Sequence, residues 1–140
     1  MVGIILVSHG LMAQGMKQSC EMIAGKRENI HALALTEEGI VPFENKLSQL
    51  LTKLKSEYED ILILTDLVNA TPFLQAYQLT SEDKSIKLIS GMNLPTLLAF
   101  ALAQENYDDF DGFVRETVNE QVHSVALFEP SVSEEDEQEL

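Results

Sequence analysis

The stretch Val2–Gly10, with the sequence VGIILVSHG, decides the fold. Its first six residues form an apolar run rich in Val and Ile, which is typical of a strand buried on both faces of a parallel sheet. The run is followed at once by Ser-His-Gly at positions 8–10, so reactive side chains lie where the strand ends. Ligands of open parallel sheets bind beyond the carboxyl ends of the strands. We therefore expect a functional site at this end of the first strand.

Downstream of this strand, short apolar runs alternate with segments that carry apolar residues at helical spacing. Further strands are expected over residues 30–35, 61–65, 86–90 and 122–128. The helical segments between them are expected to bury Met12, Met16, Cys20 and Ile23 in the first, Phe43, Leu47, Leu50, Leu51 and Leu54 in the second, and Phe73, Ala76 and Tyr77 in the third. Thr71 and Pro72 are expected to be the N-cap and first residue of that third helix. The order predicts an α/β fold, an open doubly wound and mainly parallel sheet with helices on both faces.

Length and composition exclude several classes of protein. The 140 residues suffice for one domain, expected over residues 1–128, with an acidic and disordered tail over residues 129–140. With 9 Lys and Arg against 23 Asp and Glu, the formal net charge of -14 disfavours nucleic acid and anionic membrane surfaces as partners. The single cysteine, Cys20, excludes an internal disulfide and a Cys-cluster zinc site. The N-terminal apolar run is too short for a signal peptide or a membrane span, so we expect a cytoplasmic location.

Two of the expected strand ends carry groups that can act together. His9 ends the first strand and Asp66 ends the strand over residues 61–65, and these two strands are usually neighbours in such a sheet. A carboxylate that accepts from the Nδ1–H of a histidine leaves Nε2 as the free lone pair, which is the arrangement of an activated nucleophile. Each residue also has an ordinary structural interpretation, as a satisfied polar histidine and as a turn cap. Their shared location favours a joint function.

The surrounding loops suit a phosphoryl group. Gly10 allows close approach of the backbone, Asn69 and Ala70 offer N–H groups, and Thr71 offers a hydroxyl at the start of a helix. No Lys or Arg lies in these loops, so neutral dipoles would hold the phosphoryl group. No nucleotide-binding glycine motif with the required spacing is present, and we expect no cofactor and no metal. His31 and His123 lie inside expected strands and are interpreted as structural or surface histidines.

Three motifs in this order resemble a known family. The endings IILVSHG and ILTDLVNATPF, followed by GMNLP, are similar to the mannose-type IIA components of the bacterial phosphoenolpyruvate-dependent sugar phosphotransferase system (PTS), over about residues 1–128. The resemblance implies that His9 is the phosphorylated histidine, that Asp66 is its carboxylate partner and that Thr71 belongs to the phosphate-side loop. One departure stands in that loop, since Asn69-Ala70 replaces the two glycines that usually precede Ser/Thr-Pro.

The resemblance also implies partners and an activity. Such a phosphotransferase takes a phosphoryl group from the small carrier HPr and passes it to a IIB subunit during sugar uptake. Its members are homodimers, with the fifth strand antiparallel at the interface, which would be Val122–Phe128 here. Two other functions stay open. Phospho-His9 would serve as a signal in domains of the dihydroxyacetone-kinase or transcription-activator type. Small tetrapyrrole chelatases also have an early His-Gly, although they need a second metal ligand across an open cleft.

Overall fold

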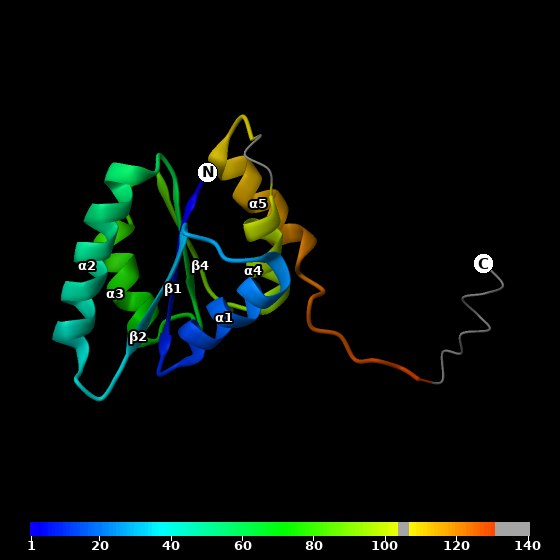
Figure 1. The fold of residues 1–140 in the computed structure, drawn as a ribbon, viewed down its shortest axis with the longest axis horizontal. Helices are drawn as coiled ribbons and strands as arrows, with labels where there is room; N and C mark the ends of the chain where they lie inside the picture. The colour runs from blue at the N-terminus through cyan, green and yellow to red at the C-terminus, as the bar shows by residue number, and fades with distance from the viewer. Residues whose placement is uncertain (104–106, 131–140) are drawn as a thin grey trace.

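The computed structural model describes residues 1–103 and 107–130, which form one α/β unit. Its sheet has the strands β1 (Gly3–His9), β2 (Ile30–Leu35), β3 (Ile61–Thr65) and β4 (Ile86–Ile89) in the order β2-β1-β3-β4. All three pairings are parallel. The helices are α1 (Met12–Ala24), α2 (Ile40–Glu57), α3 (Thr71–Thr80), α4 (Leu94–Leu102) and α5 (Phe110–Glu120). Figure 1 shows α2 and α3 on one face of the sheet and α1, α4 and α5 on the other, so the expected doubly wound architecture is confirmed.

Alternation along the central strands divides the core in two. In β1, Ile4 and Leu6 pack in the cluster beneath α1, α4 and α5, whereas Ile5 and Val7 pack in the cluster beneath α2 and α3. All four side chains are fully buried. This follows from the two-residue period of a strand that is covered on both faces. The same burial fixes the register of β1, and therefore the position of His9 at its end.

The helix stripes are confirmed in part. In α2, Phe43, Leu47, Leu51 and Leu54 are buried as expected, and Leu50 packs beside them. In α1 the prediction is wrong for the first and last of the residues expected to be buried, because Met12 and Ile23 are exposed. Ala13 is buried instead. The buried face of α1 is narrow because α1 crosses the edge of the sheet over β2 and beside α4. In α3, Tyr77 is exposed at 54% although the helical spacing placed it on the buried face.

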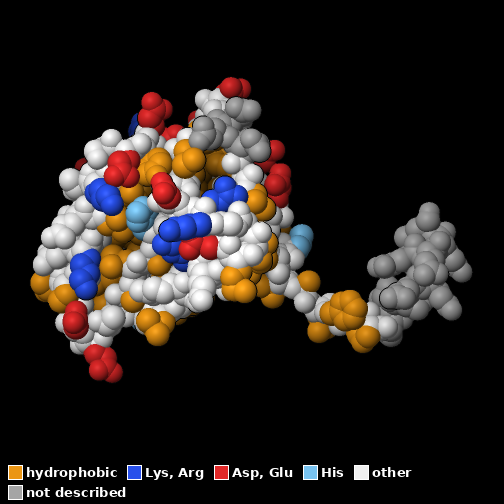
Figure 2. Space-filling model, in the orientation of Figure 1, with side chains coloured by type: hydrophobic (Ala, Val, Ile, Leu, Met, Phe, Trp, Pro, Cys, Tyr) orange, Lys and Arg blue, Asp and Glu red, His pale blue; other side chains and the backbone are white. Residues whose placement is uncertain are grey.

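The expected strand over residues 122–128 is wrong for this structure. Those residues form a turn and then an extended segment that pairs with no described strand. Its apolar side chains are largely exposed, at 61% for Val122, 89% for Val125 and 83% for Phe128. Figure 2 shows hydrophobic atoms on this segment where it leaves the body of the molecule. A strand requires a partner for its backbone groups, and residues 1–103 and 107–130 of this single chain provide none for the segment.

The acidic segment predicted over residues 129–140 lies outside the described residues from position 131 onward. No helix within the two described ranges has both the length and the apolar character required to cross a membrane.

Candidate functional site

His9 and Asp66 meet at the carboxyl edge of the sheet, where β1 and β3 end. The parallel pairing of β1 with β3 aligns Val7 with Thr65, which sets the two following turns beside each other. His9 Nδ1 lies 2.7 Å from Asp66 Oδ2, and the backbone N–H of His9 donates to the same oxygen at 2.9 Å. The contact expected between the two side chains is therefore confirmed. A carboxylate acceptor keeps the ring proton on Nδ1 and leaves the Nε2 lone pair unprotonated.

Asp66 is held as an anion by the groups around it. Burial of its side chain, which is 8% exposed, favours the neutral acid and opposes ionisation. The backbone and ring of His9 and the N–H of Leu67, which donates to Oδ1 at 2.9 Å, outweigh that burial, so the pKa of Asp66 lies below its usual value. The carboxylate accepts from three N–H groups and is fixed in position. It can therefore stabilise positive charge on the imidazole without moving.

The reactive side of the imidazole faces outward. The His9 side chain is 49% exposed, and no described residue hydrogen-bonds to its Nε2. Large apolar side chains in the adjoining turns are also exposed, at 78% for Leu11, 60% for Leu67 and 57% for Val68. Four surface cavities of about 390 to 780 Å³ lie in the described part of the chain, and His9 and Asp66 line none of these four. Exposed apolar surface beside a reactive group is typical of a site for a macromolecular partner.

Ser8 contributes to this site and was not recognised as a site residue in the sequence. Its hydroxyl is fully buried, accepts from the N–H of Ala13 at 2.8 Å and donates to the carbonyl of Gly10 at 3.2 Å. Gly10 has a positive φ of 55° and donates its N–H to the carbonyl of Leu35 at 2.9 Å. Ser8 thus closes the turn that carries His9 and caps the start of α1. Adjacent residues of a strand point to opposite faces, so the strand pattern alone gave no reason to group Ser8 with His9.

The loop before α3 contains a left-handed residue at Asn69 and departs from the prediction at Thr71. Asn69 has a φ of 61°, a left-handed conformation that asparagine tolerates, whereas Ala70 is extended. The N-cap position is Ala70, and Thr71 is the first helical residue, so the prediction that Thr71 caps α3 is wrong. Because Asn69 adopts the left-handed conformation of the turn, α3 begins one residue earlier than the Thr71-Pro72 pair predicted. The N–H groups of the first turn of α3 have no partner within the helix and can accept an anion.

The loop residues 69–71 and the pair of His9 and Asp66 follow neighbouring strands, but no described contact joins them. No described hydrogen bond joins His9 to Asn69, Ala70 or Thr71. His31 and His123 lie away from the pair, in β2 and in the segment beyond α5. Within residues 1–103 and 107–130, no group of three or more His, Cys, Asp or Glu side chains could hold a metal ion.

Comparison with known proteins points in one direction. A family model described as the PTS system fructose IIA component (EIIA-man) matches residues 3–118. The fructose-specific EIIA component of Bacillus subtilis is 32% identical over 107 residues, which are 76% of this chain and 73% of that protein. The sorbose-specific EIIA component of Lacticaseibacillus casei is 34% identical over 104 residues, 74% of each chain.

Solved structures agree with the sequence matches. The phosphotransferase system component EIIA from Streptococcus agalactiae is 29% identical and superimposes with a TM-score of 0.78, over 91% of this chain and 98% of that one. The extent of the family match, and the similarity of the whole fold, leave one assignment: the chain belongs to the EIIA-man family of PTS fructose IIA components and is an EIIA component of the sugar phosphotransferase system.

Proposed function

We propose that this chain is a phosphocarrier that accepts a phosphoryl group on His9 from phospho-HPr and passes it to a IIB subunit. The observation that supports this most directly is the 2.7 Å contact between His9 Nδ1 and the Asp66 carboxylate beside an exposed Nε2. This arrangement prepares one ring nitrogen for attack on phosphorus. It also holds the other nitrogen against a fixed negative charge.

The transfer needs no proton to move at His9. The Nε2 lone pair attacks the phosphorus of phospho-HPr, a new P–N bond forms, and the P–N bond of the HPr histidine breaks. The ring of His9 then carries its Nδ1 proton together with the phosphoryl group and is cationic, and Asp66 stabilises that cation. A nucleophile of IIB attacks the same phosphorus, the bond to Nε2 breaks, and His9 returns to the neutral ring with its Nδ1 proton.

The phosphoryl oxygens would be held by neutral donors at the start of α3. We assign this role to the backbone N–H groups of Asn69 and Ala70 and to the hydroxyl and N–H of Thr71. Gly10, whose own N–H donates to Leu35, contributes by allowing the phosphoryl group to approach the backbone closely. The unpaired N–H groups of the helix start support the assignment, because they favour an anion at that place. No Lys or Arg lies between residues 66 and 73 or between residues 8 and 16. The absence of a fixed cation keeps the phosphoryl group available for transfer.

Both partners are proteins in this proposal, and the surface supports that. The exposed apolar residues Leu11, Leu67 and Val68 lie in the turns that follow His9 and Asp66, and the imidazole itself lies outside the cavities described above. A small-molecule substrate is usually enclosed in a pocket, whereas a protein partner can exclude water by covering these apolar side chains. The molecule carries a net charge of -14, which favours partners with a basic docking face.

Labelled phosphoenolpyruvate with enzyme I and HPr tests the proposal. The wild-type chain should acquire acid-labile label, and His9→Ala should acquire none. The matched control is His123→Ala, which removes an exposed histidine elsewhere and should be labelled like the wild type. Label on His9→Ala would exclude His9 as the acceptor. Adding candidate IIB proteins should then remove the label, whereas retention with every IIB tested would favour a signalling role.

We further propose that the active form is a homodimer in which residues 122–128 of one copy add to the sheet of the other. The outer edge of β4 is unpaired among the described strands, and a groove of about 780 Å³ runs between β4 and α5, lined in part by Leu88, Ile89 and Val118. The exposed apolar side chains of residues 122–128 match this groove in character. A second copy would supply the strand partner that a single chain lacks.

A further inference from the structure

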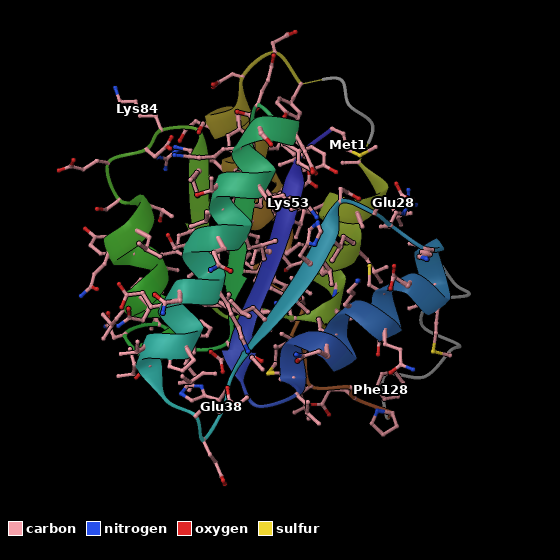
Figure 3. The ribbon with its side chains drawn as sticks, turned by 60° about the vertical axis from the view of Figure 1, so that its left-hand side comes forward. Met1, Glu28, Glu38, Lys53, Lys84 and Phe128 are labelled. Carbon is pink, nitrogen blue, oxygen red and sulfur yellow. The ribbon has the colours of Figure 1, made fainter. Side chains whose placement is uncertain are left out.

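One of the four cavities lies at the end of the sheet opposite His9, and the phosphotransfer proposal does not use it. Figure 3 shows Met1 and Glu28 at this end and Glu38 at the other. The cavity has a volume of about 720 Å³ and is formed by the start of β1, the connection between α1 and β2, the end of α4 and the start of α5. This volume lies within the range of pockets that bind small molecules.

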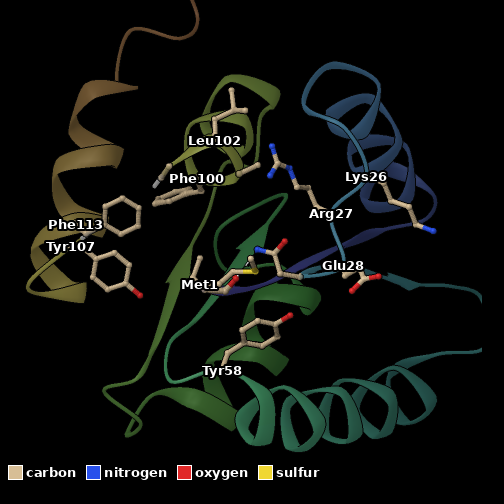
Figure 4. Close-up of a pocket in the computed structure, with 13 residues that line it drawn as sticks. Met1, Lys26, Arg27, Glu28, Tyr58, Phe100, Leu102, Tyr107 and Phe113 are labelled. Carbon is tan, nitrogen blue, oxygen red and sulfur yellow. Dashed lines mark hydrogen bonds between the residues drawn. The ribbon is translucent and has the colours of Figure 1, made fainter. Parts of the chain in front are cut away.

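Arg27 is the cation at the inner wall of this cavity. Figure 4 shows its side chain extending from the α1–β2 connection toward the end of α4, where Phe100 and Leu102 lie. Its Nη2 donates to the carbonyl of Ala24 at 2.9 Å, while its Nε is buried and has no hydrogen-bond partner. A buried donor without an acceptor is rare in folded proteins, so the folded chain satisfies the guanidinium of Arg27 only in part.

The charge around Arg27 is unusual for this molecule. The chain has 23 acidic residues against 9 Lys and Arg, yet none of the ion pairs among the described residues involves Arg27 or its neighbour Lys26. Lys26 and Glu28 lie at the rim of the cavity, so its charged side chains carry one net positive charge. The Glu21 carboxylate lies beside Arg27, but it accepts from the backbone N–H of Arg27 at 2.9 Å and forms no described ion pair with the guanidinium. A guanidinium without an ion pair can bind a carboxylate or phosphate.

The wall facing Arg27 is aromatic and rigid. The rings of Phe100 and Phe113 meet edge to face with centroids 5.7 Å apart, and Tyr107 stacks on Phe113 at 4.7 Å. Tyr107 is fixed in addition by its hydroxyl, which donates to Asp60 at 2.8 Å. Tyr58 forms a further part of the lining. Such a wall favours an apolar or ring-shaped body over a free inorganic ion.

We propose that this cavity binds a small organic anion, with its carboxylate or phosphate group against Arg27 and its apolar or ring portion against the partly buried rings of Tyr107 and Phe113. The proposal is independent of phosphotransfer, because the site lies at the opposite edge of the sheet and uses none of the residues assigned to it. Binding should therefore persist in His9→Ala.

NMR titration of the ¹⁵N-labelled protein tests the proposal with four probes: phenyl phosphate, benzoate, inorganic phosphate and phenol. We expect phenyl phosphate or benzoate to shift the amides of residues 26–29 and 100–103 in a saturable way, and the tighter of the two identifies the preferred anionic group. Inorganic phosphate and phenol should each bind at least about ten-fold more weakly. Inorganic phosphate lacks the aromatic ring, and phenol lacks the anionic group.

Variants separate the site from general charge effects. Arg27→Gln should weaken binding at least about ten-fold, while Lys46→Gln, which removes the same charge from an exposed position on α2, should leave it unchanged. Ala103→Phe keeps Arg27 but fills the cavity, and it should also abolish binding. If both variants lose binding, misfolding of Arg27→Gln alone does not explain the result. Absence of saturable shifts with both aromatic anions up to about 10 mM, or equal affinity in Arg27→Gln and Lys46→Gln, would overturn the proposal.

Discussion

The pair of His9 and Asp66 shows how a single oxygen can set both the position and the chemistry of an imidazole. Asp66 Oδ2 accepts from the backbone N–H of His9 at 2.9 Å and lies 2.7 Å from its ring Nδ1, so main chain and side chain of one residue are anchored to the same atom. Rotation of the ring about its side-chain bonds would break one contact while the other remains. The exposed Nε2 is consequently presented in one orientation.

Loss of the negative charge at position 66 should slow transfer without unfolding the protein. In Asp66→Asn the amide oxygen can still accept from His9, but the phosphorylated ring loses its counter-ion. We expect the rate of phosphoryl uptake from phospho-HPr to fall by about one to two orders of magnitude. Rapid-quench kinetics with labelled HPr measures this rate, and an unchanged rate would show that Asp66 has no role in the transfer step.

Ser8 should matter for stability as well as for the turn that carries His9. Ser8→Ala leaves the N–H of Ala13 buried without an acceptor, which should lower the free energy of unfolding by about 1 to 3 kcal/mol. The control is Ser19→Ala on the exposed face of α1, for which we expect a change within about 0.5 kcal/mol. Urea denaturation of both variants measures the difference. Equal stability of the two would contradict the buried-cap interpretation.

At this scale the sequence predicts some contacts and misses others for a clear reason. The approach of His9 to Asp66 follows from two parallel strands that end at the same edge, which a sequence pattern can reveal. The bonds of Ser8 depend on the left-handed turn at Gly10, and the cap of α3 depends on the conformation of Asn69. Such turn conformations are set by the whole loop and not by one residue type.

Among the elements, helix starts illustrate what local signals can and cannot predict. Asn93, two residues before Pro95, has the sequence of a typical N-cap, and its side chain does accept from the N–H of Thr96 at 2.9 Å at the start of α4. The same kind of signal misplaced the N-cap of α3 by one residue, because Asn69 already makes the turn. The buried stripe of α2 was predictable since one face packs on the sheet along its length. The buried face of α1 was harder to predict, because α1 packs partly over β2, the edge strand of the sheet.

One ion pair between elements should show a defined pH dependence. Lys55 of α2 pairs with Asp83 in the connection before β4, and this lysine, together with Ser85, lowers the pKa of Asp83 from 3.8 to about 2. A lowered pKa means that the carboxylate stabilises the folded state above pH 3.8 and loses that contribution as the pH falls through about 2. The pair is partly exposed, so screening by solvent keeps its contribution small.

Asp83→Asn tests this link. At pH 7 the variant should be less stable than the wild type by about 0.5 to 1 kcal/mol, and the difference should shrink as the pH is lowered from 4 toward 2. Urea denaturation at a series of pH values provides the measurement. A difference that grows at acidic pH would contradict the assigned sign.

For the whole molecule, the doubly wound sheet could be predicted because right-handed crossovers leave few arrangements for four buried strands. The fifth strand could not be placed from the sequence alone. Residues 122–128 have the composition of a strand, yet they stay extended and exposed in this chain, with Leu127 at 84% exposure. A pattern of apolar residues indicates that a segment will be buried somewhere, but it does not indicate whether the partner belongs to the same chain.

The proposed homodimer should depend on the apolar residues of that segment. We expect the wild type to sediment as a dimer and the double variant Val125→Glu with Leu127→Glu to sediment as a monomer, because two buried charges would oppose insertion into the groove beside β4. His123→Glu adds charge at an exposed polar position of the same segment and should remain dimeric. A monomeric wild type, or a double variant that dimerises like the wild type, would contradict the proposed exchange.

The central claim is that His9 carries phosphorus on the nitrogen that Asp66 leaves free. The most direct measurement is NMR of the chain labelled with ¹⁵N in its histidines, after phosphorylation by phosphoenolpyruvate, enzyme I and HPr. We expect one phosphohistidine, with coupling between phosphorus and Nε2 of His9, and a proton retained on Nδ1. Phosphorus on Nδ1, on another histidine or on none of them would contradict it.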